Sequence, residues 1–182
     1  TLNYKDAWLK IYDKPIFYFP KFFHPDPSVK RQSGFLMPGI INSSTSGNSI
    51  KIPYFAAISK NKDFTITPRL YFNGDLMVQN EFRQVEKNYK NIIDFSLKNM
   101  NGGSKSHLFA NSEIAFDLDN YEYSNLEVNI ETTSHDTYLK TENIKTQKQF
   151  SNNIMSSYLN FDMSKEDLDV KIEFSAYEDL SK

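Results

Sequence analysis

Residues 63–83 read Asp-Phe-Thr-Ile-Thr-Pro-Arg-Leu-Tyr-Phe-Asn-Gly-Asp-Leu-Met-Val-Gln-Asn-Glu-Phe-Arg, and this stretch decides the fold class. Phe64, Ile66, Leu70, Phe72, Leu76, Val78 and Phe82 alternate with Thr65, Thr67, Arg69, Tyr71, Met77, Gln79, Glu81 and Arg83. Successive side chains of a strand point to opposite faces, so a period of two predicts two β-strands. Asn73-Gly74 between them predicts a tight turn, because both residues tolerate a positive φ.

The same alternation continues on both sides of this hairpin. It recurs in residues 50–58, 93–97, 126–130 and 168–176. Helix-capping patterns are scarce, and the polar segments 98–105 and 132–153 are expected to be connections between strands. The chain is therefore predicted to be almost entirely β.

Alternation alone leaves two architectures open. A soluble β-sandwich places its polar face in water and its apolar face in a core. An outer-membrane barrel alternates because lipid lies outside the barrel and a wet lumen lies inside. The alternating stretches approach the roughly 9–11 residues of a tilted membrane strand, which favours the barrel.

Composition excludes several classes of function. The 182 residues carry a formal net charge of -2, which argues against a broadly basic surface for nucleic acid. The sequence has no cysteine, so it offers no disulfides, Cys-based zinc sites or thiol nucleophiles. The uncharged run 32–50 contains proline and several glycines and is not a membrane helix. The first residues show neither Met nor a signal-peptide pattern, so we expect an internal piece of a longer chain.

The prolines divide the sequence. All seven lie in the first 68 residues, and the aromatic tract from Trp8 to Phe23 is broken by Pro15 and Pro20. Proline cannot donate to a central ladder, so this tract predicts short extended strands. His24-Pro25-Asp26-Pro27 predicts a rigid connector, and a boundary is expected near residues 24–37.

Five motifs in the first 85 residues resemble one known family. They are Ile16-Phe17-Tyr18-Phe19-Pro20, Lys30-Arg31-Gln32-Ser33-Gly34-Phe35-Leu36-Met37-Pro38, Ile52-Pro53-Tyr54-Phe55, the Asp63–Arg69 segment, and Asn80-Glu81-Phe82-Arg83. Their order and spelling closely resemble the LptD family of lipopolysaccharide-assembly proteins. Gln32 departs from that pattern, in which two adjacent arginines often precede Ser-Gly.

The resemblance implies a fold and a division into domains. Residues 1–24 would be the last strands of a periplasmic β-jellyroll, residues 25–37 a linker, and residues 38–182 about the first eight antiparallel strands of a large outer-membrane β-barrel. Barrels of this class reach about 26 strands, so this piece would be an open sheet. The N-terminal segment would lie in the periplasm and the remainder in the outer membrane.

The resemblance also implies a function. The whole protein would assemble lipopolysaccharide into the outer leaflet, receiving it from the periplasmic bridge protein LptA and working with a lipoprotein plug of the LptE type. Lipopolysaccharide and outer-membrane lipid are the expected contacts, with no nucleic acid. No cofactor, metal or catalytic site is expected, because the three histidines are scattered and no phosphate loop or nucleophile elbow is present.

Three groups of residues are candidates for this transport. Ile16, Phe17, Tyr18 and Phe19 would line an apolar groove for acyl chains, or alternatively form ordinary jellyroll core. Lys30, Arg31, Ser33, Gly34, Phe35 and Pro38 would form the linker along the lipid path, with Lys30 and Arg31 contacting lipid phosphates or anchoring the barrel rim.

Pro53 and Pro68 form the third group. They are expected inside the first two barrel strands, where missing N–H donors weaken pairing. The resemblance implies that they help a lateral gate to open; alternatively, they mark edge strands or bulges.

Two other functions stay open at this point. Another outer-membrane barrel, such as a porin or receptor, would show the same alternation. A soluble periplasmic or extracellular β-sandwich that binds a ligand would also alternate.

Overall fold

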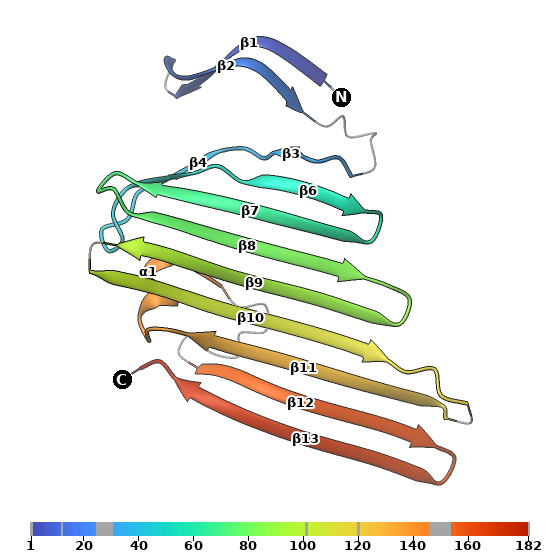
Figure 1. Ribbon diagram of the computed structural model, residues 1–182. Coiled ribbons are helices and arrows are strands. Elements are labelled where there is room, and N and C mark those ends of the chain that lie inside the picture. Colours follow the sequence, from blue (N-terminus) through green and yellow to red (C-terminus); the bar gives the residue numbers. More distant parts are fainter. Residues whose placement is uncertain are drawn as a thin grey trace.

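The computed structural model describes residues 2–11, 13–24, 31–100, 102–119, 121–145 and 154–181, and within them the chain is almost all β (Figure 1). The strands are β1 (Leu2–Ile11), β2 (Lys14–His24), β3 (Gly34–Phe35), β4 (Gly39–Ile41), β5 (Ser49–Lys51), β6 (Tyr54–Ser59), β7 (Lys62–Tyr71), β8 (Leu76–Val85), β9 (Tyr89–Met100), β10 (Gly103–Ala115), β11 (Tyr123–Thr133), β12 (Ile154–Lys165) and β13 (Leu168–Asp179). One short helix, α1 (Tyr138–Glu142), interrupts them in this part of the chain. The prediction of an all-β chain is confirmed.

Strands β1 and β2 form a separate antiparallel hairpin. Asp6 and Asp13 have positive φ values of 55° and 59°. The register shifts between Leu9 and Lys10, which pair with Phe17 and Pro15, so the hairpin carries a bulge there. The hairpin lies beyond the β3–β4 edge of the second sheet (Figure 1).

The second sheet contains eleven antiparallel strands among the described residues. Its order is β13-β12-β11-β10-β9-β8-β7-β5-β4, with β6 also paired to β7 and β3 paired to β6. Strands β5 and β6 therefore form one interrupted row beside β7, and β4 and β3 form the interrupted edge row. The sheet is open, because the edge row at one side and β13 at the other have no further partner in the described chain (Figure 1).

The predicted turn at Asn73-Gly74 is confirmed. It joins β7 to β8, and Gly74 has a φ of 94°. The Gly74 N–H donates to the Tyr71 carbonyl at 3.0 Å, and the Asp75 N–H donates to Asn73 Oδ1 at 3.1 Å. A residue with a Cβ would be strained at this φ.

Two expected connections are different in the structure. Most of segment 98–105 belongs to strands, because β9 runs to Met100 and β10 begins at Gly103. Segment 132–153 contains α1, whose Tyr138, Leu139 and Glu142 are buried. The polar composition of these two segments did not distinguish connections from strands or a helix, because polar side chains also line one face of this sheet.

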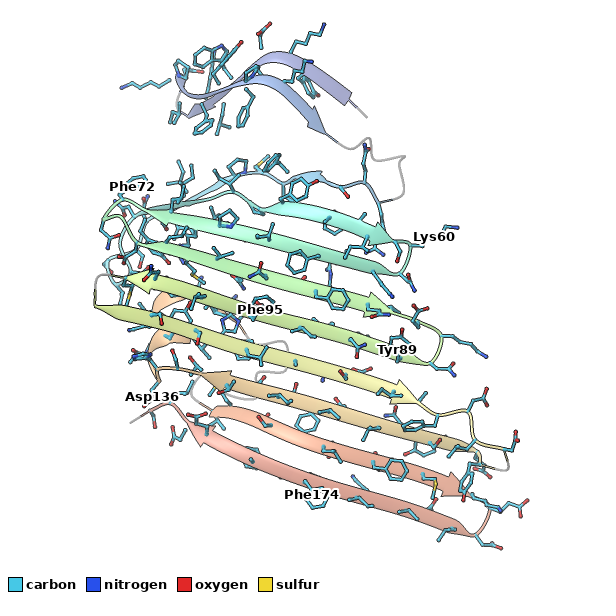
Figure 2. All side chains as sticks on the ribbon, viewed as in Figure 1. Lys60, Phe72, Tyr89, Phe95, Asp136 and Phe174 are labelled. Carbon is cyan, nitrogen blue, oxygen red and sulfur yellow. The ribbon has the colours of Figure 1, made fainter. Side chains whose placement is uncertain are left out.

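A soluble sandwich exposes its polar face and buries its apolar face, and the large sheet does the reverse. Apolar side chains of its strands are exposed, including Ile66, Leu70, Phe72, Phe95, Leu97, Ile130, Ile172 and Phe174, three of which are labelled in Figure 2. Charged and polar side chains of the other face are buried, including Asp63, Arg69, Lys98 and Glu131. We call these the apolar face and the polar face. In the described residues no helix is long and apolar enough to cross a membrane.

Candidate functional site

Arg31 fastens the linker to the large sheet. Its guanidinium forms an ion pair with the Asp63 carboxylate and donates to the Lys60 carbonyl at 2.7 Å. Arg83 Nε donates to the other Asp63 oxygen at 2.8 Å, so the buried carboxylate joins two arginines. Arg31 has a φ of 51°, which is sparsely populated for a residue with a Cβ and is held here by these contacts. Arg31 is thus bound to the sheet itself, and both predicted roles, phosphate contact and rim anchoring, stay predictions; Lys30 lies outside the described residues.

Ser33, Gly34 and Phe35 start the edge row. Ser33 Oγ accepts a hydrogen bond from the Ala57 N–H at 2.8 Å. Gly34 and Phe35 pair with Phe55 and Tyr54, and the Phe35 and Tyr54 rings meet edge-on with centroids 5.1 Å apart. The sheet thus begins at Gly34, within the segment expected to be linker.

Pro53 and Pro68 lie in adjacent rows of the sheet. Pro53 occupies the gap between β5 and β6, and Pro68 lies within β7. The edge row, which includes Pro38, precedes both prolines in the sheet. Pro53 therefore lies in the second row and Pro68 in the third, and not in the first two strands as expected. The sequence alternation gave no sign that residues 34–41 form a row of their own.

Each of these two prolines removes one hydrogen bond from a pair. The Leu36 N–H donates to the Pro53 carbonyl at 2.9 Å, and the Ile52 N–H donates to the Pro68 carbonyl at 3.1 Å. In an antiparallel ladder such residues exchange two bonds, and the returning bond needs an N–H that proline lacks. At these two positions the edge row is joined to the β5–β6 row, and that row to β7, by one hydrogen bond where a regular ladder has two. We call this line of weakened pairing the proline seam.

The aromatic tract forms the β1–β2 hairpin. The Phe17 and Phe19 rings are neighbours, with centroids 5.3 Å apart. Tyr18 instead packs on Trp8 of the paired strand at 4.8 Å. Ile16, Phe17 and Tyr18 are all 42% or more exposed, so neither face of the hairpin is enclosed by the described chain.

A buried ionic cluster on the polar face was missed by the sequence analysis. Glu142 of α1 is its centre, with only 1% of its side chain exposed. Lys98 Nζ donates to Glu142 Oε1 at 2.8 Å, while Arg69 Nη1 lies 3.1 Å from Oε2 and the Tyr71 hydroxyl donates to that same oxygen. Both carboxylate oxygens are therefore bound, as a buried charge requires.

Tyr138 forms a second contact between α1 and the polar face. Its side chain is fully buried, and its hydroxyl lies 2.8 Å from Ser96 Oγ, which is 2.6 Å from His107 Nδ1. His107 Nε2 lies 3.3 Å from Asp94 Oδ1. Burial raises the pKa of Tyr138 to about 12, so the hydroxyl stays protonated at physiological pH.

The sequence offered only a weak signal for this cluster. Arg69 and Lys98 lie on the polar side of the alternation, but so do many exposed charges. α1 has five residues and no side-chain cap, so no helix signal marked it. Arg69 and Glu142 are 73 residues apart in sequence, and only the tertiary structure brings them together.

Replacing Asp63 with Asn is expected to loosen the linker from the sheet. The change leaves Arg31 without its carboxylate, at a cost of about 1–2 kcal/mol after allowing for the half-exposed guanidinium groups. Amide exchange in the whole protein should then be roughly tenfold faster at Leu36 and Ala57. The matched control is Glu81→Gln, which removes a carboxylate 3.3 Å from Arg83 but not from Arg31. Equal exchange in the two variants would contradict the anchoring role.

The chain matches a family of known proteins over nearly its whole length. The profile of a family described as "LptD protein" matches residues 4–180. LPS-assembly protein LptD of Psychrobacter cryohalolentis is 39% identical over 80 residues, which are 44% of this chain and 8% of that protein. The LptD proteins of Francisella tularensis subsp. novicida and Pseudomonas aeruginosa are 31% and 32% identical over 51% and 52% of the chain.

The aligned parts cover 11% and 10% of those two relatives, so the matched segment spans about a tenth of each. The family match continues far beyond residue 85, where the recognisable motifs end. Among the described residues, no group of three or more His, Asp or Glu side chains could hold a metal ion.

Proposed function

The chain belongs to the LptD protein family, and from this premise we propose that it is part of an outer-membrane translocon that assembles lipopolysaccharide into the outer leaflet. In this proposal residues 1–24 end a periplasmic jellyroll and the large sheet is the first part of the barrel. Lipid passes from the jellyroll, along the linker, to a lateral gate at the first strands. LptA would deliver the lipid, and an LptE-type lipoprotein would plug the lumen. The step is transport and makes or breaks no covalent bond.

The exposed apolar face supports a lipid-facing wall. A continuous apolar surface is costly in water, whereas in a bilayer it replaces lipid contacts at little cost. The polar face, with Arg69, Lys98 and Glu131 buried on it, would then line the lumen. A porin would share these two faces, but the family match favours the translocon over a porin or a soluble sandwich.

The connections between strands support an orientation. Lys60 and Tyr89 mark one end of the sheet in Figure 2, and Phe72 and Asp136 mark the other. The chain enters the sheet at the Lys60 end, whereas the longest connection, with α1, lies at the Asp136 end. Outer-membrane barrels have short periplasmic turns and longer extracellular loops. The Lys60 end, and the hairpin before it, would therefore be periplasmic.

The hairpin offers the kind of surface that acyl chains need. Each methylene exposed to water costs about 0.8 kcal/mol, so an acyl chain of about a dozen methylenes costs on the order of 10 kcal/mol. Ile16, Phe17, Tyr18 and Phe19 present apolar area on both faces of β2. We propose that one of these faces continues the groove of the complete jellyroll.

The proline seam is the observation that carries the gate. It lies in the rows next to the open edge, and at Pro53 and Pro68 it lacks the returning hydrogen bonds of two pairs. A missing backbone bond cannot be replaced by water inside a bilayer, so rows joined in this way separate at lower cost. Lipid would leave sideways where the wall opens most easily.

Replacing Pro53 and Pro68 together with Ala is expected to slow lipid delivery without preventing barrel assembly. The new N–H groups can donate to the Leu36 and Ile52 carbonyls, and each bond adds about 0.5–1.5 kcal/mol to the closed seam. Appearance of newly made lipopolysaccharide at the cell surface should slow roughly two- to tenfold per restored bond. The measurement is pulse-labelling followed by surface detection.

The control for this experiment replaces Pro15 and Pro20 with Ala, which changes two prolines of the hairpin and leaves the seam intact. Wild-type delivery in the seam variant, with normal amounts of folded barrel, would overturn the gate assignment. An equal delay in both variants would show a general effect of losing prolines.

A further inference from the structure

Arg69 connects α1 to the strands beside the proline seam. It follows Pro68 on β7, and its Nε donates to Ser49 Oγ of β5 at 2.8 Å. Its Nη2 donates to Ser46 Oγ, in the connection between β4 and β5, at 3.2 Å. The remaining nitrogen, Nη1, donates to the Glu142 carbonyl at 3.2 Å and pairs with the Glu142 carboxylate. One guanidinium therefore holds both the β4–β5 hairpin and α1.

The β4–β5 hairpin has few other attachments. Its ladder pairs with β7 are limited to Ser49, Ile50 and Lys51, with one further backbone hydrogen bond at each end, from the Phe72 N–H to the Asn48 carbonyl and from the Ile52 N–H to the Pro68 carbonyl. β4 pairs with β5 over three residues. A hairpin this short is at best marginally stable by itself. The two hydrogen bonds from Arg69 to Ser46 and Ser49 thus make up a substantial part of what fixes it to the sheet.

The position of α1 in turn depends on its contacts with the sheet. A helix of five residues is far below the length that is stable in isolation. Glu142 is bound by Arg69 and by Lys98 of β9, which ties α1 across β7 and β9. A polar pocket of about 490 Å³ remains between α1 and the β4–β5–β7 region, lined in part by Lys51, Thr67 and Thr141. The helix is therefore held over this region by the charged contacts of Glu142 together with the buried side chains of Tyr138 and Leu139, and a polar space remains beside them.

We propose that Glu142, Arg69, Ser46 and Ser49 form a latch that keeps the proline seam closed while α1 is docked. Docked Glu142 fixes the Arg69 guanidinium in the orientation that reaches both serines. When α1 leaves, Arg69 loses its carboxylate partner, the serine contacts weaken, and the β4–β5 hairpin is free to separate from β7. The mechanical link does not depend on what crosses the seam; its role in lipid release rests on the proposed function.

The test is hydrogen exchange of the whole protein in detergent, read by mass spectrometry for segments 39–51 and 134–145. In Glu142→Gln, the amides of both segments should exchange roughly tenfold faster or more, because the buried Arg69 and Lys98 lose the carboxylate that they share. Lys140→Gln is the matched control, since it removes an exposed charge from the same helix and leaves Arg69 and Lys98 paired. It should leave segment 39–51 unchanged.

A second variant keeps the test decisive if Glu142→Gln yields little folded protein. The double change Ser46→Ala and Ser49→Ala leaves α1 its carboxylate contacts but cuts the link to the hairpin. Segment 39–51 should then exchange faster while segment 134–145 keeps most of its protection. Faster exchange of α1 alone in Glu142→Gln, or an unchanged hairpin in the serine variant, would overturn the latch. Neither result would affect the gate, which the proline variant tests separately.

Discussion

Replacing Arg69 with Met is expected to destabilise the docking of α1 and of the β4–β5 hairpin by about 3–5 kcal/mol. Met keeps much of the apolar stem but removes the charge and every hydrogen bond. Only 7% of the Arg69 side chain and 1% of the Glu142 side chain are exposed, so water cannot replace the lost partner. The cost should lie near the lower end of this range, because Lys98 still binds Glu142 at 2.8 Å.

The measurement is the protection of amides in segments 39–51 and 134–145 of the whole protein. A loss of about 3 kcal/mol corresponds to roughly a hundredfold lower protection. Arg69→Lys is an informative companion, because Lys retains the charge but lacks the planar fork that reaches Ser46, Ser49 and Glu142 together. It should restore protection of α1 more than protection of the hairpin.

A double-mutant cycle separates the ion pair from general loss of packing. Arg69→Met combined with Glu142→Gln removes both charges, so the second change should cost much less than it does alone. Additive losses would show that Arg69 and Glu142 act independently, and the ionic account of α1 docking would then be wrong.

Replacing Tyr138 with Ala is expected to release α1 almost completely, at a cost of about 3–5 kcal/mol. Tyr138 is the largest fully buried side chain among the described residues, and it packs near the His107 ring. Its removal leaves a cavity between α1 and the polar face and also breaks the hydrogen bond to Ser96. Protection in segment 134–145 should fall roughly a hundredfold or more.

Tyr138→Phe is the matched control, since it keeps the ring and removes only the hydroxyl. It should cost about 1 kcal/mol, as for a single hydrogen bond. If Phe and Ala destabilise α1 equally, the polar contact with Ser96, and not the buried ring, holds the helix. Wild-type protection in the Ala variant would mean that the ionic cluster alone is sufficient.

The strands and their two faces were predictable because strand alternation is a local property. Phe64, Ile66 and Leu70 share the apolar side in the sequence and lie on the apolar face of β7 in the structure. The turn at Asn73-Gly74 was predictable for the same reason. The alternation could not show whether the polar or the apolar face would be buried, because the strands of a soluble sandwich and of a membrane barrel alternate in the same way.

The position of the candidate site was only partly predictable. Pro53 and Pro68 indicated a region of weakened pairing, but their rows in the sheet could not be assigned without the short interrupted strand at residues 34–41. Arg31 was identified as a candidate, whereas its partner Asp63 was noted only as part of a motif. An ion pair between residues 32 positions apart requires the sheet register, which single-sequence patterns do not supply.

The β-strands, the alternation of their faces, the family motifs and the prolines that remove ladder donors could all be recognised in the amino-acid sequence. These depend on side-chain type and spacing along a few neighbouring residues. The tertiary structure was needed to show that α1 packs on part of the polar face, that Asp63 binds Arg31, and that Glu142 meets Arg69 and Lys98. Those contacts join residues 32, 73 and 44 positions apart. In these contacts the attraction between paired charges offsets the cost of removing them from water, and this requires partners that meet only when the sheet has formed.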